Sequence, residues 1–312
     1  MTRHIRFGIV LAAFLIAAPA IAQDSGTLKK IKDKNTITLG VREASNPFSF
    51  LDDKQQYVGY SIDLCMKIVA AVKTQLKLPD LKVNLTKVTP LIRMQMLMNG
   101  DIDLECGSTT NSVERQKQVA FVVTTFFTGT RMLVKTSSGI KNYKDLKGKA
   151  VAVTMGTTNE RAIKDYNFQE SLGIRFVDAK DHHEALAAVD NGSAVAFPSD
   201  DVLLYSMRAN GRSPADFAVV GDFLTDEPYG IMLRKDDAPF KKLADSAVIA
   251  LMKSGEMEKI YARWFQSPIP PKNANLNMPM NSTLRKYVRN PSDAGVDKCG
   301  RMQCMMSLSR EM

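Results

Sequence analysis

The feature that most constrains the fold of this chain is a repeated alternation of short apolar runs and amphipathic segments. Runs of this kind predict strands, and apolar residues three and four positions apart predict helices. Alternation along the chain indicates α/β domains with mostly parallel sheets. The predicted strands are Thr36–Val41, Val83–Val88, Asp103–Cys106, Thr130–Lys135, Ala150–Val153, Arg175–Val177 and Ala194–Phe197, and the predicted helices are Ile62–Val72, Leu91–Met98, one beginning near Thr158, and Glu184–Val189.

One arrangement occurs twice. A helix ending at Met98 is followed by Asn-Gly and a strand up to Glu105, and a helix ending at Val189 is again followed by Asn-Gly and a strand up to Phe197. Polar residues follow both strands, and one of them is Asp200. Ligands of open α/β sheets bind outside the carboxyl ends of the strands, so the two ends could face one cleft. Helix-Asn-Gly-strand is also a common connection and is weak as a lone signal.

The segment from Glu105 to Arg115 is the strongest functional signal. A short strand leads into Ser108, Thr109 and Thr110, a helix start follows, and an arginine comes five residues after Thr110. Hydroxyl groups, backbone N–H groups and a guanidinium in this order are suited to bind a carboxylate. We therefore predict a protein that binds small anionic solutes.

Two further strand ends carry matching groups. Thr154 and Thr157 surround Gly156 directly before a predicted helix, where hydroxyls and a helix N-terminus favour an anion. Gly-Thr-Thr is also an ordinary helix N-cap sequence. Arg42 follows the first strand and Arg93 opens the helix after Val88. Three arginines at strand ends, counting Arg115, favour ligand binding over isolated surface ion pairs.

The N-terminus predicts export. Basic residues precede an apolar run from Phe7 to Ala17, and Ala20-Ile-Ala22 fits a signal-peptidase site, so we assign residues 1–22 as a cleaved signal peptide. Its removal lowers the formal charge from +9 to +7. No basic cluster is interleaved with aromatic residues, and we expect no nucleic-acid partner. Disulfides are permitted outside the cytoplasm. Cys65 could pair with Cys106, and Cys299 with Cys304, but spacing does not decide this.

The chain resembles the periplasmic amino-acid-binding components of ABC transporters, most closely the glutamate/aspartate-binding branch, over residues 28–275. The motifs that carry the resemblance are Gly40-Val-Arg-Glu, Val58-Gly-Tyr-Ser-Ile-Asp63, Glu105 to Gln118, Asp145-Leu-Lys-Gly-Lys149, Ala179-Lys-Asp-His182, Tyr229 to Asp237 and Pro268-Ile-Pro-Pro-Lys-Asn273.

The resemblance implies a type II periplasmic-binding-protein fold with two hinge crossings, near Thr130 and near Tyr229. Each lobe would be a mostly parallel sheet flanked by helices. Lobe one would comprise residues 24–129 with 228–275, lobe two residues 130–227, and residues 276–312 would form a C-terminal tail, of which the part after about Met280 matches nothing in the family. The protein would act as a monomer in the periplasm, deliver its ligand to an inner-membrane ABC permease, and need no cofactor or metal.

By the same resemblance, the ligand would be L-glutamate or L-aspartate, with no preference between them assigned. The α-carboxylate would be bound by Ser108, Thr110 and Arg115 with Thr154 and Thr157, the α-ammonium by Asp200, and the side-chain carboxylate by Arg42, Arg93 and His182. Three arginines and one aspartate would give the pocket a net charge of +2. Pro90 departs from the family pattern, because a small hydroxyl residue is expected there.

Two alternatives remain at this stage. The ligand could be another polar amino acid, or the protein could be an enzyme on the same fold, such as a cyclohexadienyl dehydratase. An enzyme would need a general acid over the leaving hydroxyl. No carboxylate at a matching strand end pairs with His182 in the sequence, so we expect a binding protein and no catalytic residue.

Overall fold

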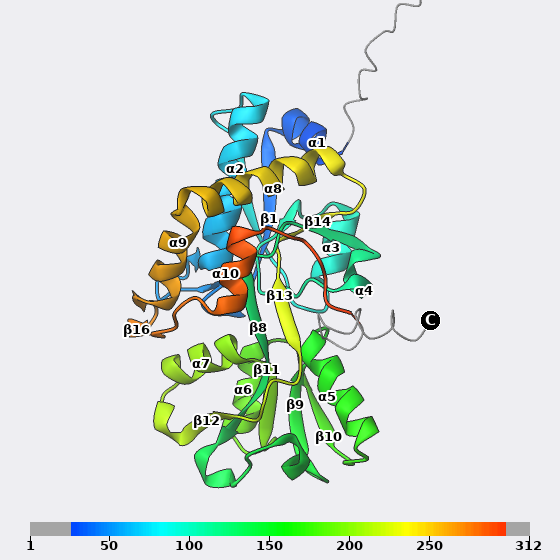
Figure 1. Ribbon diagram of the computed structural model, residues 1–312, viewed down its shortest axis with the longest axis vertical. Helices are drawn as coiled ribbons and strands as arrows, with labels where there is room; N and C mark the ends of the chain where they lie inside the picture. The colour runs from blue at the N-terminus through cyan, green and yellow to red at the C-terminus, as the bar shows by residue number, and fades with distance from the viewer. Residues whose placement is uncertain (1–25, 298–312) are drawn as a thin grey trace, which may run out of the picture.

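The computed structural model describes residues 26–297 and shows two lobes that are connected by extended segments (Figure 1). Each lobe has a central sheet with helices on both faces. Within the described residues, no helix is long and apolar enough to cross a membrane. The signal peptide predicted at residues 1–22 and the cysteines Cys299 and Cys304 lie outside this part of the chain.

Lobe one is built around a five-stranded sheet. β1 pairs in parallel with β5 and β6, whereas β14 is antiparallel to both β6 and β7. Helices α2, α8 and α9 cover one face, and α3 covers the other. In sheet order the strands are β5 (Lys82–Lys87), β1 (Thr36–Val41), β6 (Leu104–Glu105), β14 (Met232–Arg234) and β7 (Val119–Phe121), and the helices of lobe one are α1 (Thr27–Lys34), α2 (Tyr60–Leu76), α3 (Arg93–Asn99), α4 (Val113–Gln116), α8 (Ala238–Ser254) and α9 (Glu256–Phe265).

Lobe two contains the second sheet. β9 pairs in parallel with β10 and β11, and the long strand β8 is antiparallel to β11, β12 and β13. Helix α5 packs on one face, and α6 and α7 on the other. The strands are β10 (Arg175–Ala179), β9 (Ala150–Thr154), β11 (Ala196–Asp200), β8 (Phe126–Lys135), β12 (Phe217–Val220) and β13 (Asp226–Tyr229), and the helices are α5 (Thr158–Gln169), α6 (His182–Asp190) and α7 (Asp201–Asn210).

The shorter elements occupy the edges of the lobes. β2, β3 and β4 form a small antiparallel sheet beside the first lobe, and β15 pairs with β16. Three single turns of 3₁₀ helix complete lobe two. Their bounds are β2 (Ala44–Ser45), β3 (Ser49–Leu51), β4 (Tyr57–Val58), β15 (Pro268–Ile269) and β16 (Ala274–Asn275), with 3₁₀ turns at Thr136–Ser138, Tyr143–Leu146 and Pro214–Asp216.

The alternation predicted from the sequence is present, and the two-lobed α/β architecture is confirmed. β1 has the predicted bounds, and α5 begins at Thr158 because the Thr157 side chain caps it by accepting a hydrogen bond from the Glu160 N–H. Both sheets are mixed, however. The antiparallel strand is β14 in the first sheet and β8 in the second. Each of these two strands directly follows a crossing of the chain from one lobe to the other.

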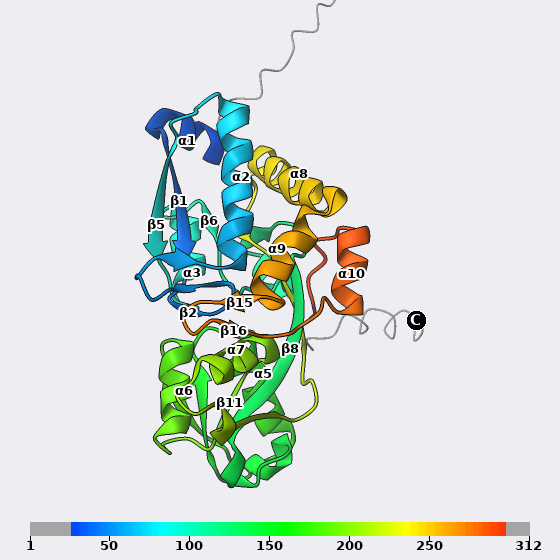
Figure 2. The same ribbon diagram turned by 90° about the vertical axis from the view of Figure 1, so that its left-hand side faces the viewer.

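The chain crosses between the lobes at residues 122–125 and 230–231. β8 and β13 pair from Phe126 with Tyr229 to Gly129 with Asp226, so both crossings share one antiparallel ribbon (Figure 1). In the turned view, β8 runs from one lobe toward the other (Figure 2). The lobe boundaries that we predict at residues 129–130 and 227–228 fall inside this ribbon. Phe48, Tyr60, Phe126, Tyr229 and Phe265 pack their rings together beneath it, with neighbouring centroids 4.8–6.2 Å apart.

The described part of the predicted tail is folded onto lobe one. α10 (Ser282–Arg289) packs on α8 and β8, with Leu284 buried and the ring of Tyr287 stacked on Phe127. After the helix, the chain runs back to the segment that precedes α4. There Val113 N–H donates to Val296 O and Val296 N–H donates to Asn111 O. The tail therefore supports the segment that connects Thr110 with Arg115.

Candidate anion-binding site between the lobes

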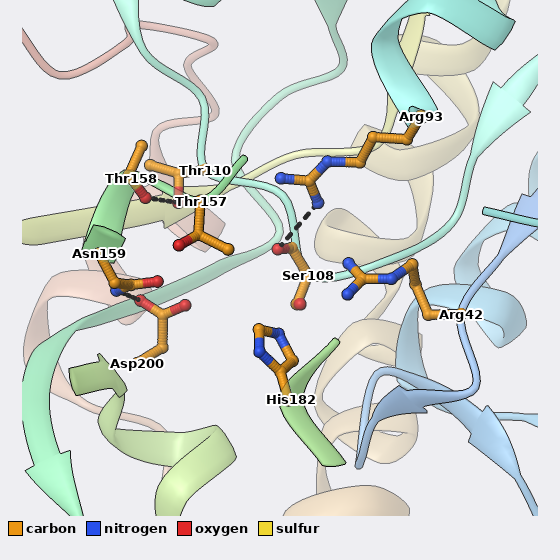
Figure 3. Close-up of a pocket in the computed structure, with 9 residues that line it drawn as sticks. All are labelled: Arg42, Arg93, Ser108, Thr110, Thr157, Thr158, Asn159, His182 and Asp200. Atoms are coloured by element: carbon orange, nitrogen blue, oxygen red, sulfur yellow. Dashed lines mark hydrogen bonds between the residues drawn. The ribbon is translucent and has the colours of Figure 1, made fainter. Parts of the chain in front are cut away.

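Nine polar side chains from both lobes meet around one cavity (Figure 3). The cavity has a volume of about 10 Å³, which is space for roughly one water molecule. The lobes are therefore closed on each other in this structure. The lining residues are Arg42, Arg93, Ser108 and Thr110 from lobe one and Thr157, Thr158, Asn159, His182 and Asp200 from lobe two.

The cavity lies where the predicted strand ends converge. Arg42 follows β1, Ser108 and Thr110 follow β6, and Asp200 ends β11. His182 is the first residue of α6, which Asp181 caps by accepting a hydrogen bond from the Glu184 N–H. Parallel strands bring their carboxyl ends to one edge of a sheet, and each lobe turns that edge toward the other. Seven of the nine predicted site residues line the cavity.

Arg42 is a buried cation whose charge is not compensated by a hydrogen-bond partner at the cavity within residues 26–297. Its side chain is 2% exposed, and neither terminal guanidinium nitrogen has a hydrogen-bond partner among the described residues. Burial, followed by the charge of Arg93, lowers the pKa of Arg42 to about 9. A buried cation without hydrogen bonds is costly unless an anion compensates it, so this end of the cavity is suited to a negatively charged group.

Arg93 is held differently. One terminal nitrogen donates to Thr109 Oγ1 and to Ser108 O at 3.4 Å, and it lies 3.7 Å from Glu105 Oε1. Burial lowers the pKa of Arg93, and the charge of Glu105 opposes that shift. Glu105 is fully buried on β6 and also accepts a hydrogen bond of 2.6 Å from Thr109. Arg93 therefore has a resident counter-ion.

Gly107 makes this packing possible. A Cβ at Gly107 would lie 2.3 Å from Glu105 Oε1 and 3.0 Å from Arg42 Cγ, so only glycine leaves room for both side chains.

His182 enters the cavity as a neutral group. The ring is 2% exposed, and its Nδ1 lies 2.9 Å from Thr154 Oγ1. Burial, with the charges of Arg42 and Arg93, lowers the pKa of His182 well below its usual value. Thr154 contacts the histidine and does not line the cavity. It orients His182 in this conformation.

Asp200 lies at the end of the cavity opposite the arginines (Figure 3). Its pKa is raised to about 7, first by burial and then by the charge of Glu227. Asn159 opposes the shift by donating to Asp200 Oδ1 at 3.1 Å. The cavity thus has a cationic end and an anionic end, which suits a solute with charges of both signs.

Arg115 does not line the cavity. Its guanidinium donates to Thr110 O at 2.9 Å and, across the lobes, to Gly156 O at 3.2 Å. Burial, followed by the charge of Arg93, lowers its pKa to about 10. Gly156 has φ +80°, and a Cβ there would lie 2.8 Å from Leu91 Cα. This close approach brings the Gly156 carbonyl group within reach of Arg115.

The predicted pocket charge of +2 needs correction. Besides Asp200, the network around the cavity contains the buried carboxylates of Glu105 and Glu227, so the formal charge falls to zero. The sequence alone places Glu105 at the start of the anion-binding segment without a role of its own and assigns no role to Glu227. Thr158 and Asn159 were also missed, although they adjoin the predicted Thr157 at the start of α5.

A disulfide fixes one wall of the site. Cys65 on α2 is bonded to Cys106, with 6.2 Å between the Cα atoms. Cys106 directly precedes Gly107 and Ser108. This is one of the two pairings that the sequence left open, and it ties the start of the site loop to the helix behind the first sheet.

Fold and site together define a two-lobed solute-binding protein that encloses a small charged molecule. Residues 37–267 match the family of bacterial extracellular solute-binding proteins, family 3, and the chain belongs to this family. It is 48% identical over 290 residues to the L-glutamate/L-aspartate-binding protein of Pseudomonas aeruginosa, covering 92% of this chain and 96% of that protein.

A second relative, the glutamate/aspartate import solute-binding protein of Escherichia coli, is 44% identical over 92% of this chain and 97% of its own length. Among solved structures, a mutant of ArgBP from T. maritima superposes with a TM-score of 0.69 at 27% identity, over 77% of this chain and 99% of that one. The Pseudomonas and Escherichia coli proteins are both named as binding proteins, and the second is named for import. The chain is accordingly a binding protein and not an enzyme, as expected.

Proposed function

We propose that this protein captures L-glutamate or L-aspartate by closure of its two lobes and delivers it to the permease of an ABC transporter. The observation that carries the proposal is the guanidinium of Arg42, which is buried in the cavity without a hydrogen-bond partner among the described residues. A side-chain carboxylate would meet this fork with two parallel hydrogen bonds. A neutral amide would leave a desolvated cation uncompensated, at a cost of several kcal/mol.

The names of the two relatives support the same solutes, since one is named for binding and the other for import of glutamate and aspartate. The polarity of the cavity agrees. Arg42 and Arg93 would take the side-chain carboxylate, and neutral His182 would donate from Nε2–H in the tautomer whose Nδ1 accepts from Thr154. Asp200 would accept hydrogen bonds from the α-ammonium at the opposite end.

The α-carboxylate assignment changes for Thr154, Thr157 and Thr110. Thr154 contacts His182, and the Thr157 hydroxyl already donates to Thr154 O at 2.8 Å. Arg115 and Ser108 remain the proposed partners, with Arg115 reaching the carboxylate after its bond to Gly156 O is exchanged. Thr110 already donates its hydroxyl proton to Glu227. It is therefore better suited to accept a hydrogen bond from the ammonium than to donate one to a carboxylate.

The proposed mechanism is a ligand-driven shift between open and closed forms. A cavity of about 10 Å³ is too small for an amino acid, so the solute enters while the lobes are apart. Contacts from Asp200, His182 and Thr157 exist only after closure. They supply the difference in affinity between the two forms that such a shift requires.

The proposal includes location and partners. Residues 1–22 would direct export and be removed, the mature protein would work in the periplasm as a monomer, and the closed form would dock on an inner-membrane permease. The family is extracellular by its description, which supports export.

Calorimetric titration tests the function directly. The mature protein, unfolded and refolded to remove bound solute, is titrated with L-glutamate, L-aspartate, L-glutamine, L-asparagine and prephenate. We expect dissociation constants of about 1 μM or lower for the two acids, which corresponds to about −8 kcal/mol, and much weaker binding of the amides. Equal binding of the amides, or heat only with prephenate, would contradict the proposal.

A further inference from the structure

Glu227 is a buried carboxylate that the proposed function does not use. It lies on β13, one strand of the ribbon between the lobes, and is 1% exposed. No basic side chain within the described residues lies within 4.0 Å of it, although its charge opposes the lowering of the Arg115 pKa. A carboxylate in this position is costly unless hydroxyl groups satisfy it.

Three threonine hydroxyls satisfy Glu227. Oε2 accepts hydrogen bonds from Thr110 of lobe one and from Thr158 of lobe two, the latter at 2.7 Å. Oε1 accepts from Thr225 at 2.6 Å. An ionised carboxylate has only acceptor positions, so each threonine spends its single hydroxyl proton on Glu227.

The consequence for the cavity is a fixed polarity. Thr110 and Thr158 both line the cavity, yet only the lone pairs of their oxygens remain available to a ligand. Lone pairs accept hydrogen bonds from an ammonium group and repel a carboxylate. Glu227 itself stays behind the lining and acts through these hydroxyls.

Hydrogen bonds also connect Glu227 with Asp200. Asn159 donates to Asp200 Oδ1 at 3.1 Å and to Thr130 Oγ1 at 2.7 Å. Thr130 lies 2.7 Å from Thr225, whose proton is committed to Glu227, so Thr130 is the donor in that pair. The two carboxylates are therefore joined by one chain of hydrogen bonds. The charge of Glu227 also contributes to the raised pKa of Asp200.

We propose that Glu227 is a positioning residue that makes this end of the site require an ammonium group. It holds Thr110 and Thr158 as hydrogen-bond acceptors and adds a second negative charge behind Asp200. The inference rests on the proposed function, because it concerns how an amino acid is distinguished from a plain dicarboxylate. Glutarate, which is glutamate without the amino group, is the discriminating probe.

Glu227→Gln tests the proposal. The amide keeps the size of the side chain and removes its charge. Its NH₂ group is a hydrogen-bond donor, so at least one threonine hydroxyl must rotate and accept from it. We expect the wild-type protein to bind L-glutamate more tightly than glutarate, and the ratio of the two affinities to fall about tenfold or more in the variant. Calorimetry measures both dissociation constants, and the pH is held at 7.5.

Glu105→Gln is the matched control. It makes the same substitution at a buried carboxylate on the arginine side, where both probes carry the same carboxylate, so the ratio should stay within about twofold of wild type. If Glu227→Gln does not fold, Thr158→Val removes one oriented hydroxyl without changing any charge. It should lower the ratio about 3- to 10-fold.

The outcomes separate the two proposals. A wild-type protein that binds neither probe overturns the proposed function. A wild-type protein that binds both equally, or folded variants that keep the wild-type ratio, overturn the role of Glu227 and leave the binding of dicarboxylates standing.

Discussion

Arg42 and Arg93 lie in the same cavity, but their positive charges are compensated in different ways. Arg93 has Glu105 and Thr109 as partners, whereas the terminal nitrogens of Arg42 have none among the described residues. The two arginines should therefore respond differently to substitution. Arg42 should serve the ligand alone, while Arg93 should serve both the ligand and the folded state.

We expect Arg42→Met to lower the affinity for L-glutamate about 100-fold or more and to leave binding of L-glutamine unchanged or tighter, because no desolvated cation then faces the amide. The unfolding free energy of the ligand-free variant should be unchanged or higher, because an uncompensated buried cation is removed. Arg93→Met should also weaken L-glutamate binding, but it should cost about 3–5 kcal/mol of stability by leaving Glu105 without its counter-ion. Denaturant unfolding and calorimetry measure the two quantities, and equal stability of the variants would contradict this division.

The raised pKa of Asp200 predicts a pH dependence. In the folded protein its pKa is about 7, against 3.8 ordinarily, so the folded state holds a proton that the unfolded state releases. The stabilisation from this proton is fully present below about pH 3.8 and is lost as the pH rises to about 7. As the pH rises across that range, the unfolding free energy of the ligand-free wild type should therefore fall relative to that of Asp200→Asn. A difference that is constant with pH would show that Asp200 is ionised throughout.

At the scale of secondary-structure elements, α10 and the residues after it form a strap that the family resemblance did not explain. Leu284 is buried against lobe one, and Lys241 on α8 pairs with Asp293 at 2.9 Å. Asn111 and Gln116 side chains both donate to Asp293 O at 2.8 Å. The strap thus fixes the outer side of the segment whose inner side carries Thr110.

A chain that ends after Met280 lacks this strap. We expect its unfolding free energy to fall by about 3 kcal/mol or more, because Leu284 and Tyr287 no longer bury apolar surface. Its affinity for L-glutamate should fall about tenfold, because the segment around Asn111 must be ordered on binding. A chain that ends after Asp297 is the control and should match the full-length protein in both measurements. A truncated chain with wild-type affinity would show that the strap does not support the site.

Most elements that position the site could be predicted from sequence, because strands such as β1 and helices such as α5 carry strong local signals. The polar residues at their ends followed from the general location of ligand sites in α/β sheets. Glu105 and Glu227 could not be found in this way, because the cation beside Glu105 comes from α3 and two of the three threonines that donate to Glu227 lie far away in sequence. Glu227 meets Thr110, which is 117 residues away in sequence. Such a pairing exists only once the chain has folded and β13 lies beside the segment that carries Thr110.

At the scale of the whole molecule, closure depends on a few direct contacts between the lobes. Thr110 of lobe one and Thr158 of lobe two both donate to Glu227 Oε2, Arg115 donates to Gly156 O at 3.2 Å, and Ser206 donates to Asn46 Oδ1 at 2.7 Å. Gly156 also approaches the backbone of Pro90 and Leu91 so closely that an added Cβ would lie 2.8–2.9 Å from it. Pro90 therefore has a role in closure, at a position where the family pattern would place a hydroxyl residue.

Gly156→Ala should interfere with closure. Its Cβ would lie within 3.0 Å of the Leu91 backbone, which cannot move aside as a flexible side chain would. We expect an affinity for L-glutamate lower by about 10- to 100-fold, and a smaller decrease in radius of gyration on adding solute, measured by small-angle X-ray scattering. Gly192→Ala is the control, because Gly192 has a similar φ of +82° but no atom within 4 Å of its added Cβ. It should lose stability only, and equal effects of both substitutions would contradict the steric explanation.

The position of β14 has a consequence for how the protein is made. β14 lies between β6 and β7 in the first sheet, although all the strands of lobe two come between β7 and β14 along the chain. During synthesis from the N-terminus, lobe two is therefore fully translated before lobe one can complete its sheet. Arg42 and Arg93 are among the first residues of the site to be synthesised, long before β14, which completes their sheet. A nascent chain shorter than about 234 residues cannot assemble the finished binding site.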